Sequence, residues 1–270
     1  MVLFGGRSAE HDISKISASH VLRAVALARY EVVPIGITKD GAWLLAQEAA
    51  DLIEQGRADE LPDSLKIDGP ELQPFEILTG STEEAPTVVL PILHGPNGED
   101  GTVQGLLEMA QVPYVGAGVL GSAVAMDKAM AKTVLDAAGI AQPSWAAVRV
   151  TELDQAQELV ARLIAELGET IFVKPANMGS SIGITKAHGS EQLLAALELA
   201  FEYDEIAVVE EAVVSRELEV AVLGNRSPRA SVVGEIIPAA EFYDYEDKYA
   251  DGTAQSVIPA QISAAASVEL

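Results

Sequence analysis

The first half of the chain alternates short apolar runs with longer amphipathic stretches. The short runs are typical of buried strands and lie at residues 2–4, 30–37, 88–93 and 114–116. Residues at helical spacing predict helices at about 102–110 and 13–28, the latter with an apolar face of Ile13, Ile16, Val21, Leu22 and Val25. Strands that alternate with helices favour an open, mostly parallel α/β sheet, with residues 47–86 as a helix and a variable excursion.

The second half has a different texture. Its short strands are expected at 145–150, 171–175, 184–185 and 207–211, and an antiparallel pair at 217–223 and 230–237. Its helices are expected at 123–138, 152–167 and 191–201, with another beginning near residue 263. Antiparallel strands mixed with helices predict an α+β arrangement for this half.

Charge and composition exclude several classes of function. The 270 residues carry a formal net charge of −24, which repels phosphate backbones and anionic lipid, so we expect neither nucleic-acid nor membrane binding. The chain has no cysteine, so disulfides, thiolate metal sites and a cysteine nucleophile are excluded. The first residues lack a basic region and a long apolar run, and no stretch approaches the length of a membrane span. These features predict a cytoplasmic protein.

The most informative segment is the glycine- and serine-rich turn at 173–184. Lys174 ends a strand and offers a point charge to a phosphate, while Ser180 and Ser181 add hydroxyl donors. Residues with little side-chain bulk let backbone N–H groups approach phosphate oxygens. The segment therefore indicates phosphate binding, and an ordinary hairpin turn with a surface lysine is the alternative.

Two further segments follow predicted strands. His94, Glu99 and Asp100 lie among glycines at 94–101, where metal binding, substrate orientation and a plain polar turn are all compatible with the pattern. Glu10 follows the glycines at 5–6, and it also suits the first turn of a helix. Because ligands of open α/β sheets bind at the carboxyl ends of strands, both segments are candidates for a site.

A polar loop at 241–249 carries aromatic and charged residues without apolar periodicity, among them Lys248 and Tyr249. Such a loop is suited to close over a ligand and exclude water from a reactive intermediate. A solvated connection with half-packed tyrosines is the alternative.

Together these segments resemble the D-alanine–D-alanine ligases of the ATP-grasp superfamily. The matching segments are GGRSAEHDIS at 5–14, HGPNGEDG at 94–101, MDK at 126–128, VKPANMGSSIGI at 173–184 and FYDYEDKY at 242–249. The resemblance implies an N-terminal α/β substrate-binding domain at 1–116, a central ATP-grasp domain at 117–211 and an incomplete C-terminal ATP-grasp domain at 212–270.

The resemblance also implies the reaction. ATP phosphorylates the carboxylate of one D-alanine, the amine of a second attacks the acyl phosphate, and the dipeptide supplies peptidoglycan synthesis. Glu10 is then expected to hold the ammonium of the first D-alanine, and His94 to orient substrate near the transferred group, with Glu99 in support. Glu10, Ser180 and Tyr249 are expected to form a hydrogen-bonded group that helps deprotonate the second D-alanine. Lys248 would neutralise charge from the lid, and the Lys248–Tyr249 pair favours an amine nucleophile.

By the same resemblance, a second set of residues binds ATP. Lys128 and Lys174 are expected to contact its phosphates, and Ser180 and Ser181 to grip them. The strand that ends at Glu210 and Glu211 is expected to read the adenine edge through a backbone N–H and carbonyl. Glu217 is expected to accept from the ribose hydroxyls, which suits a carboxylate.

The family continues beyond the last residue printed for this chain, and its two Mg²⁺ (or Mn²⁺) ions are held there. We therefore expect no metal ligand within residues 1–270, a C-terminal truncation, and little ligase activity from these residues alone. The resemblance implies a homodimer. A nucleotide-binding fragment without catalysis and another ATP-grasp carboxylate–amine ligase are the alternative functions.

Overall fold

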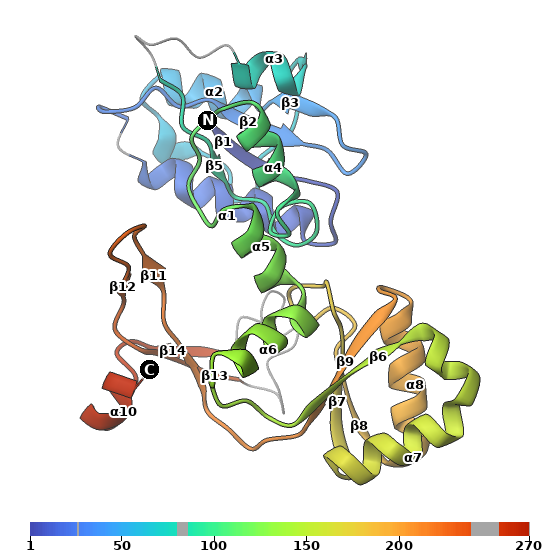
Figure 1. Cartoon of the computed structure of the whole chain (residues 1–270). Helices are drawn as coiled ribbons and strands as arrows, with labels where there is room; N and C mark the ends of the chain where they lie inside the picture. The colour runs from blue at the N-terminus through green and yellow to red at the C-terminus, as the bar shows by residue number, and fades with distance from the viewer. Residues whose placement is uncertain (26, 80–85, 239–253, 270) are drawn as a thin grey trace. The chain divides into compact units, whose positions relative to one another are not determined.

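The computed structural model describes residues 1–25, 27–79, 86–238 and 254–269. The chain divides into two compact units, which we describe one at a time (Figure 1). Unit 1 comprises Met1–Gln142 with Pro175–Gly179, and unit 2 comprises Pro143–Lys174 with Ser180–Leu270. The domain boundaries expected at residues 116 and 211 stay a prediction.

Unit 1 is built on a five-stranded sheet with the order β4-β3-β2-β1-β5. Its strands are β1 (Val2–Gly5), β2 (Pro34–Ile37), β3 (Trp43–Leu45), β4 (Glu71–Leu72) and β5 (Leu90–Pro91). β1 runs parallel to β2 and β5, as the alternation of strands and helices predicts. β3 is antiparallel to β2, because the short turn between them can join only antiparallel strands, and β4 pairs antiparallel with β3. The strand expected at 114–116 is reduced to one bridge between Val89 and Tyr114.

Helices cover both faces of this sheet. The helical segments of unit 1 are α1 (His11–Ala24), α2 (Gln47–Glu54), η1 (Ala58–Glu60), α3 (Pro74–Thr79), α4 (Thr102–Met109), α5 (Val119–Met126) and α6 (Lys128–Ala137). Side chains of a strand alternate between the two faces. Leu3 therefore packs with Leu107 of α4, whereas Phe4 packs with Leu22 of α1.

The inner face of α1 differs from the apolar face that the sequence predicts. Its buried residues are His11, Ser14, Ala18, Ser19 and Leu22. Of the predicted face only Leu22 is fully buried, and Ile16 is 37% exposed. Small residues let the helix approach β1 closely, and the buried serine hydroxyls hydrogen-bond to backbone groups, which offsets the cost of burying them.

The helix expected at 123–138 is two helices that meet at Asp127. The backbone of Asp127 is extended, and its carboxylate accepts a hydrogen bond of 2.9 Å from the N–H of Met130. This geometry is an N-cap, so Asp127 ends α5 and begins α6.

Unit 2 contains a four-stranded sheet with the order β6-β9-β7-β8. Its strands are β6 (Trp145–Arg149), β7 (Thr170–Pro175), β8 (Thr185–His188) and β9 (Ile206–Glu211). The helices α7 (Ala156–Leu167) and α8 (Gly189–Phe201) cover one face of the sheet, and η2 (Val150–Gln155) precedes α7 (Figure 1). Ile171 and Val173 of β7 point into this core.

Smaller antiparallel elements complete unit 2. They are β10 (Glu217–Glu219), β11 (Val222–Leu223), β12 (Arg229–Ala230), β13 (Gly234–Ile237), β14 (Gln255–Val257) and α10 (Ala264–Glu269). β10 pairs with β13 and β11 with β12, which confirms the antiparallel pair expected there; β14, which the sequence did not indicate, pairs with β13. In the described part of the chain, no helix has the length and apolar character needed to cross a membrane.

The turn before α4 is ordered by one carboxylate. Asp100 accepts hydrogen bonds from the N–H groups of Asn97 at 2.8 Å and Thr102 at 2.9 Å. Burial opposes the charge of Asp100, but these backbone donors outweigh burial and hold the pKa of its carboxyl below the usual 3.8. The ionised side chain therefore stabilises the folded turn.

We predict that Asp100→Asn lowers the free energy of unfolding at pH 7 by about 1 kcal/mol, because asparagine has one acceptor oxygen in place of the two that accept from Asn97 and Thr102. Since the folded-state pKa is depressed, the contribution of the charge is present above pH 3.8 and is lost as the pH falls through the folded-state value. Urea unfolding of both proteins at pH 7 and pH 3 measures the difference. A difference that stays the same at both pH values contradicts the assignment.

Candidate functional site

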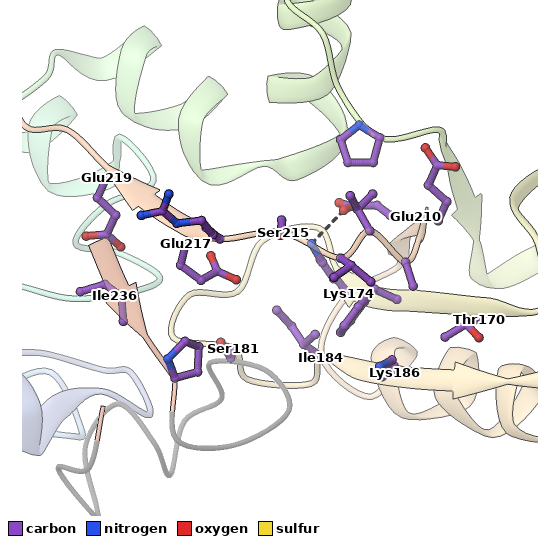
Figure 2. Close-up of a pocket in the computed structure, with 18 of the residues that line it drawn as sticks. Thr170, Lys174, Ser181, Ile184, Lys186, Glu210, Ser215, Glu217, Glu219 and Ile236 are labelled. Carbon is purple, nitrogen blue, oxygen red and sulfur yellow. Dashed lines mark hydrogen bonds and ion pairs between the residues drawn. The ribbon is translucent and has the colours of Figure 1, made fainter. Parts of the chain in front are cut away.

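Unit 2 contains a cavity of about 920 Å³ between its four-stranded sheet and the strands that follow it (Figure 2). Thr170 and Lys186 lie at one end of the cavity in Figure 2, and Glu219 and Ile236 lie at the other. The volume falls within the range of roughly 300–1,000 Å³ that is usual for ligand and cofactor sites. The cavity is therefore large enough for a nucleotide.

Side chains of β7 point alternately to the two faces of the sheet, and those on one face form the floor of the cavity. Ile171 and Val173 point into the core, so Thr170, Phe172 and Lys174 line the cavity. Lys186 of β8 is the register partner of Phe172. The ammonium groups of Lys174 and Lys186 lie 5.9 and 6.0 Å from the centre of the Phe172 ring. The floor thus offers two cations around one aromatic ring, of which the sequence analysis identified Lys174 alone.

Lys174 is held by an ion pair inside the cavity. Its Nζ lies 2.9 Å from Oε2 of Glu210, which is buried near the end of β9 (Figure 2). Burying either charge alone is costly, so each stabilises the other in this position. The pair fixes the lysine where a phosphate group of a bound ligand would find a cation.

Glu211 takes part in the fold through both its side chain and its backbone. Its carboxylate accepts a hydrogen bond of 2.7 Å from the N–H of Ser144, and its own N–H donates to the carbonyl of Ser144 at 3.0 Å. The N–H of Ala212 donates to the carbonyl of Thr170 at 3.1 Å. Val213 is the next residue, and it is exposed and lines the cavity. The backbone of Val213, two residues beyond Glu211, therefore also borders the cavity.

The far wall of the cavity combines charges of both signs. Glu217 of β10 is exposed and lines the cavity, and its contact with a ribose stays a prediction. Arg216 binds Glu235 in a two-point contact, with hydrogen bonds of 2.7 and 2.6 Å. This hydrogen bonding raises the pKa of Arg216 and lowers that of Glu235. Glu235 is thereby held as a carboxylate paired with arginine.

The glycine- and serine-rich turn has an unusual backbone. Ser180 and Ser181 have φ angles of 49° and 60°, which residues other than glycine rarely adopt. Ser181 also lines the cavity. The N–H of Ile184 donates to the carbonyl of Ser181 at 3.2 Å and closes the turn. Backbone N–H groups in a turn conformation of this kind can form a concave site for an anion.

In unit 1, three of the predicted segments meet at Glu10. Glu10 is 2% exposed, and it lies directly before α1. A Cβ atom on Gly95 would lie 2.2 Å from its carboxylate oxygen Oε2, and a Cβ on Gly179 would lie 3.3 Å from the same atom. The two glycines therefore leave the space that the carboxylate occupies. The structure thus brings Glu10 together with the HGPNGEDG segment and with the start of the glycine–serine turn.

His94 is held by contacts from both neighbouring segments. The hydroxyl of Ser8 donates to its carbonyl at 2.9 Å and accepts from the N–H of Glu10 at 3.1 Å. Ring atom Nε2 of His94 lies 3.1 Å from Oγ of Ser17 on α1. Glu99 accepts a hydrogen bond of 2.6 Å from the N–H of Gly95, so its role here is to hold the turn that carries His94.

The MDK segment contacts the same turn from another side. The backbone N–H of Lys128 donates to the carbonyl of Ala176 at 3.0 Å, and its ammonium donates to the carbonyl of Met178. The amide of Asn177 donates to Asp127 at 3.3 Å. Lys128 therefore supports the loop at 176–178, and this contact was not anticipated from the sequence.

The contacts above do not test the residues predicted in the lid. Lys248 and Tyr249, with the whole lid segment at 241–249, fall outside the described residues. The hydrogen-bonded group of Glu10, Ser180 and Tyr249 therefore stays a prediction. Among the described residues, no group of three or more His, Asp or Glu side chains is placed to hold a metal ion.

Comparison with known proteins agrees with these observations. The family model described as D-ala D-ala ligase N-terminus matches residues 1–117, and the model described as D-ala D-ala ligase C-terminus matches residues 134–270. D-alanine–D-alanine ligases from Geobacillus kaustophilus and Bacillus pumilus are 44% and 45% identical to this chain over 267 and 271 residues. Each alignment covers 97% of this chain and 73% or 74% of the relative.

Solved structures give the same result. The D-Ala:D-Ser ligase VanG from Enterococcus faecalis aligns with 99% of this chain and 78% of its own, with a TM-score of 0.78 and 35% identity. The D-alanine–D-alanine ligase from Coxiella burnetii aligns with 87% of this chain and 70% of its own, with a TM-score of 0.69 and 35% identity. The N-terminal mixed sheet and the antiparallel sheets that follow it are those of an ATP-grasp ligase. The chain belongs to the D-alanine–D-alanine ligase family.

Proposed function

We propose that this chain joins two molecules of D-alanine in a reaction that consumes ATP and supplies peptidoglycan synthesis. The observation that carries the proposal is the buried carboxylate of Glu10, held between Gly95, which follows β5, and Gly179 of the glycine–serine turn. A buried carboxylate at such a place is suited to bind the ammonium group of an amino acid. The cavity of unit 2, which Lys174 lines, supplies a separate place for a nucleotide.

ATP is assigned to the cavity on the basis of its charges. Lys174 and Lys128 are proposed to bind phosphate oxygens, with Ser180 and Ser181 donating from the strained turn. The strand end at Glu210 and Glu211, with the backbone of Val213 after it, is proposed to read the base edge through an N–H and a carbonyl. Glu217 accepts from the ribose hydroxyls. The ion pair between Lys174 and Glu210 sets the position of the lysine before ligand arrives.

The proposed reaction has two steps. A carboxylate oxygen of the first D-alanine bonds to the terminal phosphorus of ATP, the bond from that phosphorus to ADP breaks, and an acyl phosphate forms. The amine of the second D-alanine then bonds to the acyl carbon, loses a proton, and phosphate leaves. Glu10 holds the first ammonium, His94 orients the reacting group, and the lysines lower the negative charge that the carboxylate meets. Ser180, Tyr249 and Lys248 are proposed to complete the site.

Mg²⁺ is the metal that the family implies for phosphoryl transfer. The described residues do not provide a cluster of ligand side chains that fits it, and no step above is routed through it. We propose that residues 1–270 by themselves bind nucleotide and turn over slowly. We also propose a homodimer in the cytoplasm, where ATP is available.

A second candidate is ligation of D-alanine to a different second substrate. The observation in its favour is the structural likeness to a D-Ala:D-Ser ligase. Both candidates use the same first substrate, the same nucleotide and Glu10. They differ only in the second substrate, which attacks the acyl phosphate.

The function is tested by measuring ADP release and dipeptide formation by purified residues 1–270 with ATP, Mg²⁺ and D-alanine. We expect a titration with a non-hydrolysable ATP analogue to show binding, and turnover to be slow. Robust turnover with D-alanine would contradict slow turnover and support the ligase assignment, whereas turnover with D-serine alone as second substrate would support the second candidate. Absence of nucleotide binding would contradict the assignment of the cavity.

We predict that Lys174→Met weakens ATP binding by about 10- to 100-fold, the effect of losing one hydrogen bond between charged groups. Lys186→Met is the matched control, because Lys186 flanks the same ring of Phe172 from the other strand. We expect it to change the affinity by less than about 3-fold, since it lies at the end of the cavity away from Ser181. Calorimetric titration of the folded variants provides the measurement, and equal losses in both would overturn the placement of the phosphates.

We predict that Gly95→Ala weakens D-alanine binding by at least about 10-fold, because its new methyl group would displace the carboxylate of Glu10. Gly95 also has a φ of +72°, so backbone strain contributes to any loss of stability. Gly56→Ala is the matched control: its φ is +70°, and a Cβ there meets no atom within 4 Å. Comparison of D-alanine affinity and thermal unfolding separates the two causes, and unchanged affinity in Gly95→Ala would refute the role of Glu10.

A further inference from the structure

One face of α1 carries a polar stripe that points at the ends of two strands. Glu10, Ser14 and Ser17 recur at i, i+4 and i+7, the spacing of residues on one face of a helix. The hydroxyl of Ser14, which is fully buried, accepts from the N–H of Gly5 at 2.7 Å and donates to the carbonyl of Ile92. Ser17, one turn further on, meets the ring of His94 two residues beyond Ile92. The stripe therefore joins the ends of β1 and β5 through hydroxyl groups.

The contact between Ser17 and His94 is 3.1 Å long and involves Nε2 of the ring. A hydroxyl either donates to this nitrogen or accepts from it, and the two cases correspond to different tautomers of the neutral ring. If Ser17 accepted, its own proton would have only water as an acceptor, because among the described residues His94 alone is hydrogen-bonded to that hydroxyl. Ser17 is partly buried, and donation from Ser17 to Nε2 places its proton on a protein acceptor. His94 then carries its proton on Nδ1.

We propose that Ser17 is a positioning residue that holds the imidazole of His94 in the Nδ1–H tautomer. The proposal rests on the proposed function in one respect, because that function gives His94 its role near the reacting group. Ser17 itself is not proposed to contact substrate. Its effect is exerted through the orientation and proton position of the ring.

The proton position matters for the ligands of this site. An Nδ1–H group donates to an anionic oxygen, either of a carboxylate or of a phosphoryl group. The opposite tautomer would present a lone pair to that oxygen, which is repulsive. In water, imidazole favours the Nε2–H form, so the protein must supply the preference for Nδ1–H. Ser17 supplies it with one hydrogen bond at a fixed place on a helix.

His11 provides an internal reference. Its Nδ1 lies 2.9 Å from the carbonyl of Gly6, and since a carbonyl only accepts, His11 must donate from Nδ1. Its tautomer is thus fixed independently of Ser17. The chain has only four histidines, so each ring can be followed separately.

The test is the tautomer of each histidine by ¹⁵N NMR of the purified, ¹⁵N-histidine-labelled chain at pH 8, above the ordinary histidine pKa of about 6.5. His94→Gln identifies the His94 signals. We expect the Nδ1–H pattern for His94 in the wild type and in Ser17→Thr, which keeps the hydroxyl, and a shift toward Nε2–H in Ser17→Ala. His11 is expected to stay Nδ1–H in every variant. An Nε2–H pattern for His94 in the wild type, or an unchanged pattern in Ser17→Ala, would overturn the proposal.

Ser19→Ala is the matched control for general damage to α1. Ser19 is also fully buried on this helix, but its hydroxyl donates to the carbonyl of Pro62, away from His94. We expect it to lower thermal stability while the His94 pattern stays that of the wild type. A change at His94 in this variant comparable to that in Ser17→Ala would show that the tautomer follows the packing of α1, and would refute the specific role of Ser17.

Adding D-alanine with a non-hydrolysable ATP analogue separates this proposal from the proposed function. We expect the Nδ1–H signal of His94 to shift in the wild type and in Ser17→Thr, and the shift to fall at least about 5-fold in Ser17→Ala, the loss expected for one hydrogen bond. If ligand produces no shift in any protein while the tautomers are as stated, the role of His94 in the reaction fails and the positioning by Ser17 stands.

Discussion

The burial of the Glu10 carboxylate is the constraint on which the rest of unit 1 depends. A charge removed from water is costly, so the surroundings must make room for it and supply compensating groups. Gly95 and Gly179 make that room, because a Cβ atom on either would crowd the carboxylate. The glycines of two separate segments therefore have a common cause, and the serines of α1 fix the strand ends that carry one of them.

In unit 2 the corresponding constraint is the alternation of side chains between the two faces of a single strand, β7. β7 sends Ile171 and Val173 into the core and Phe172 and Lys174 into the cavity. The same residues that hold α7 and α8 to the sheet therefore set the position of the lysine that faces a ligand. A shift of β7 by one residue would exchange the two sets and remove both the core and the cation.

The sequence was sufficient to predict the parallel strands of unit 1, the main strands of unit 2, most of the longer helices and the family, because each depends on local pattern or on a recognisable segment. It did not indicate β3, β4 or β14, which are short strands held by pairing with their neighbours. It did not predict the inner face of α1, where a buried serine, Ser14, is found instead of an apolar residue. The cost of burying its hydroxyl is offset by long-range hydrogen bonds. It also missed the break at Asp127, since the cap depends on backbone geometry rather than helix propensity. Lys186 and Val213 were missed because only pairing of β7 with β8, and the hydrogen bonds after β9, place them at the cavity.

The ammonium of Lys128 donates to the carbonyl groups of Ala176 and Met178. One side chain therefore supplies both a positive charge and two of the contacts that order the loop at 176–178. Replacing it with an uncharged residue would alter the electrostatic potential and the conformation of the loop together, so the result of such a change could not be interpreted as the loss of a charge alone.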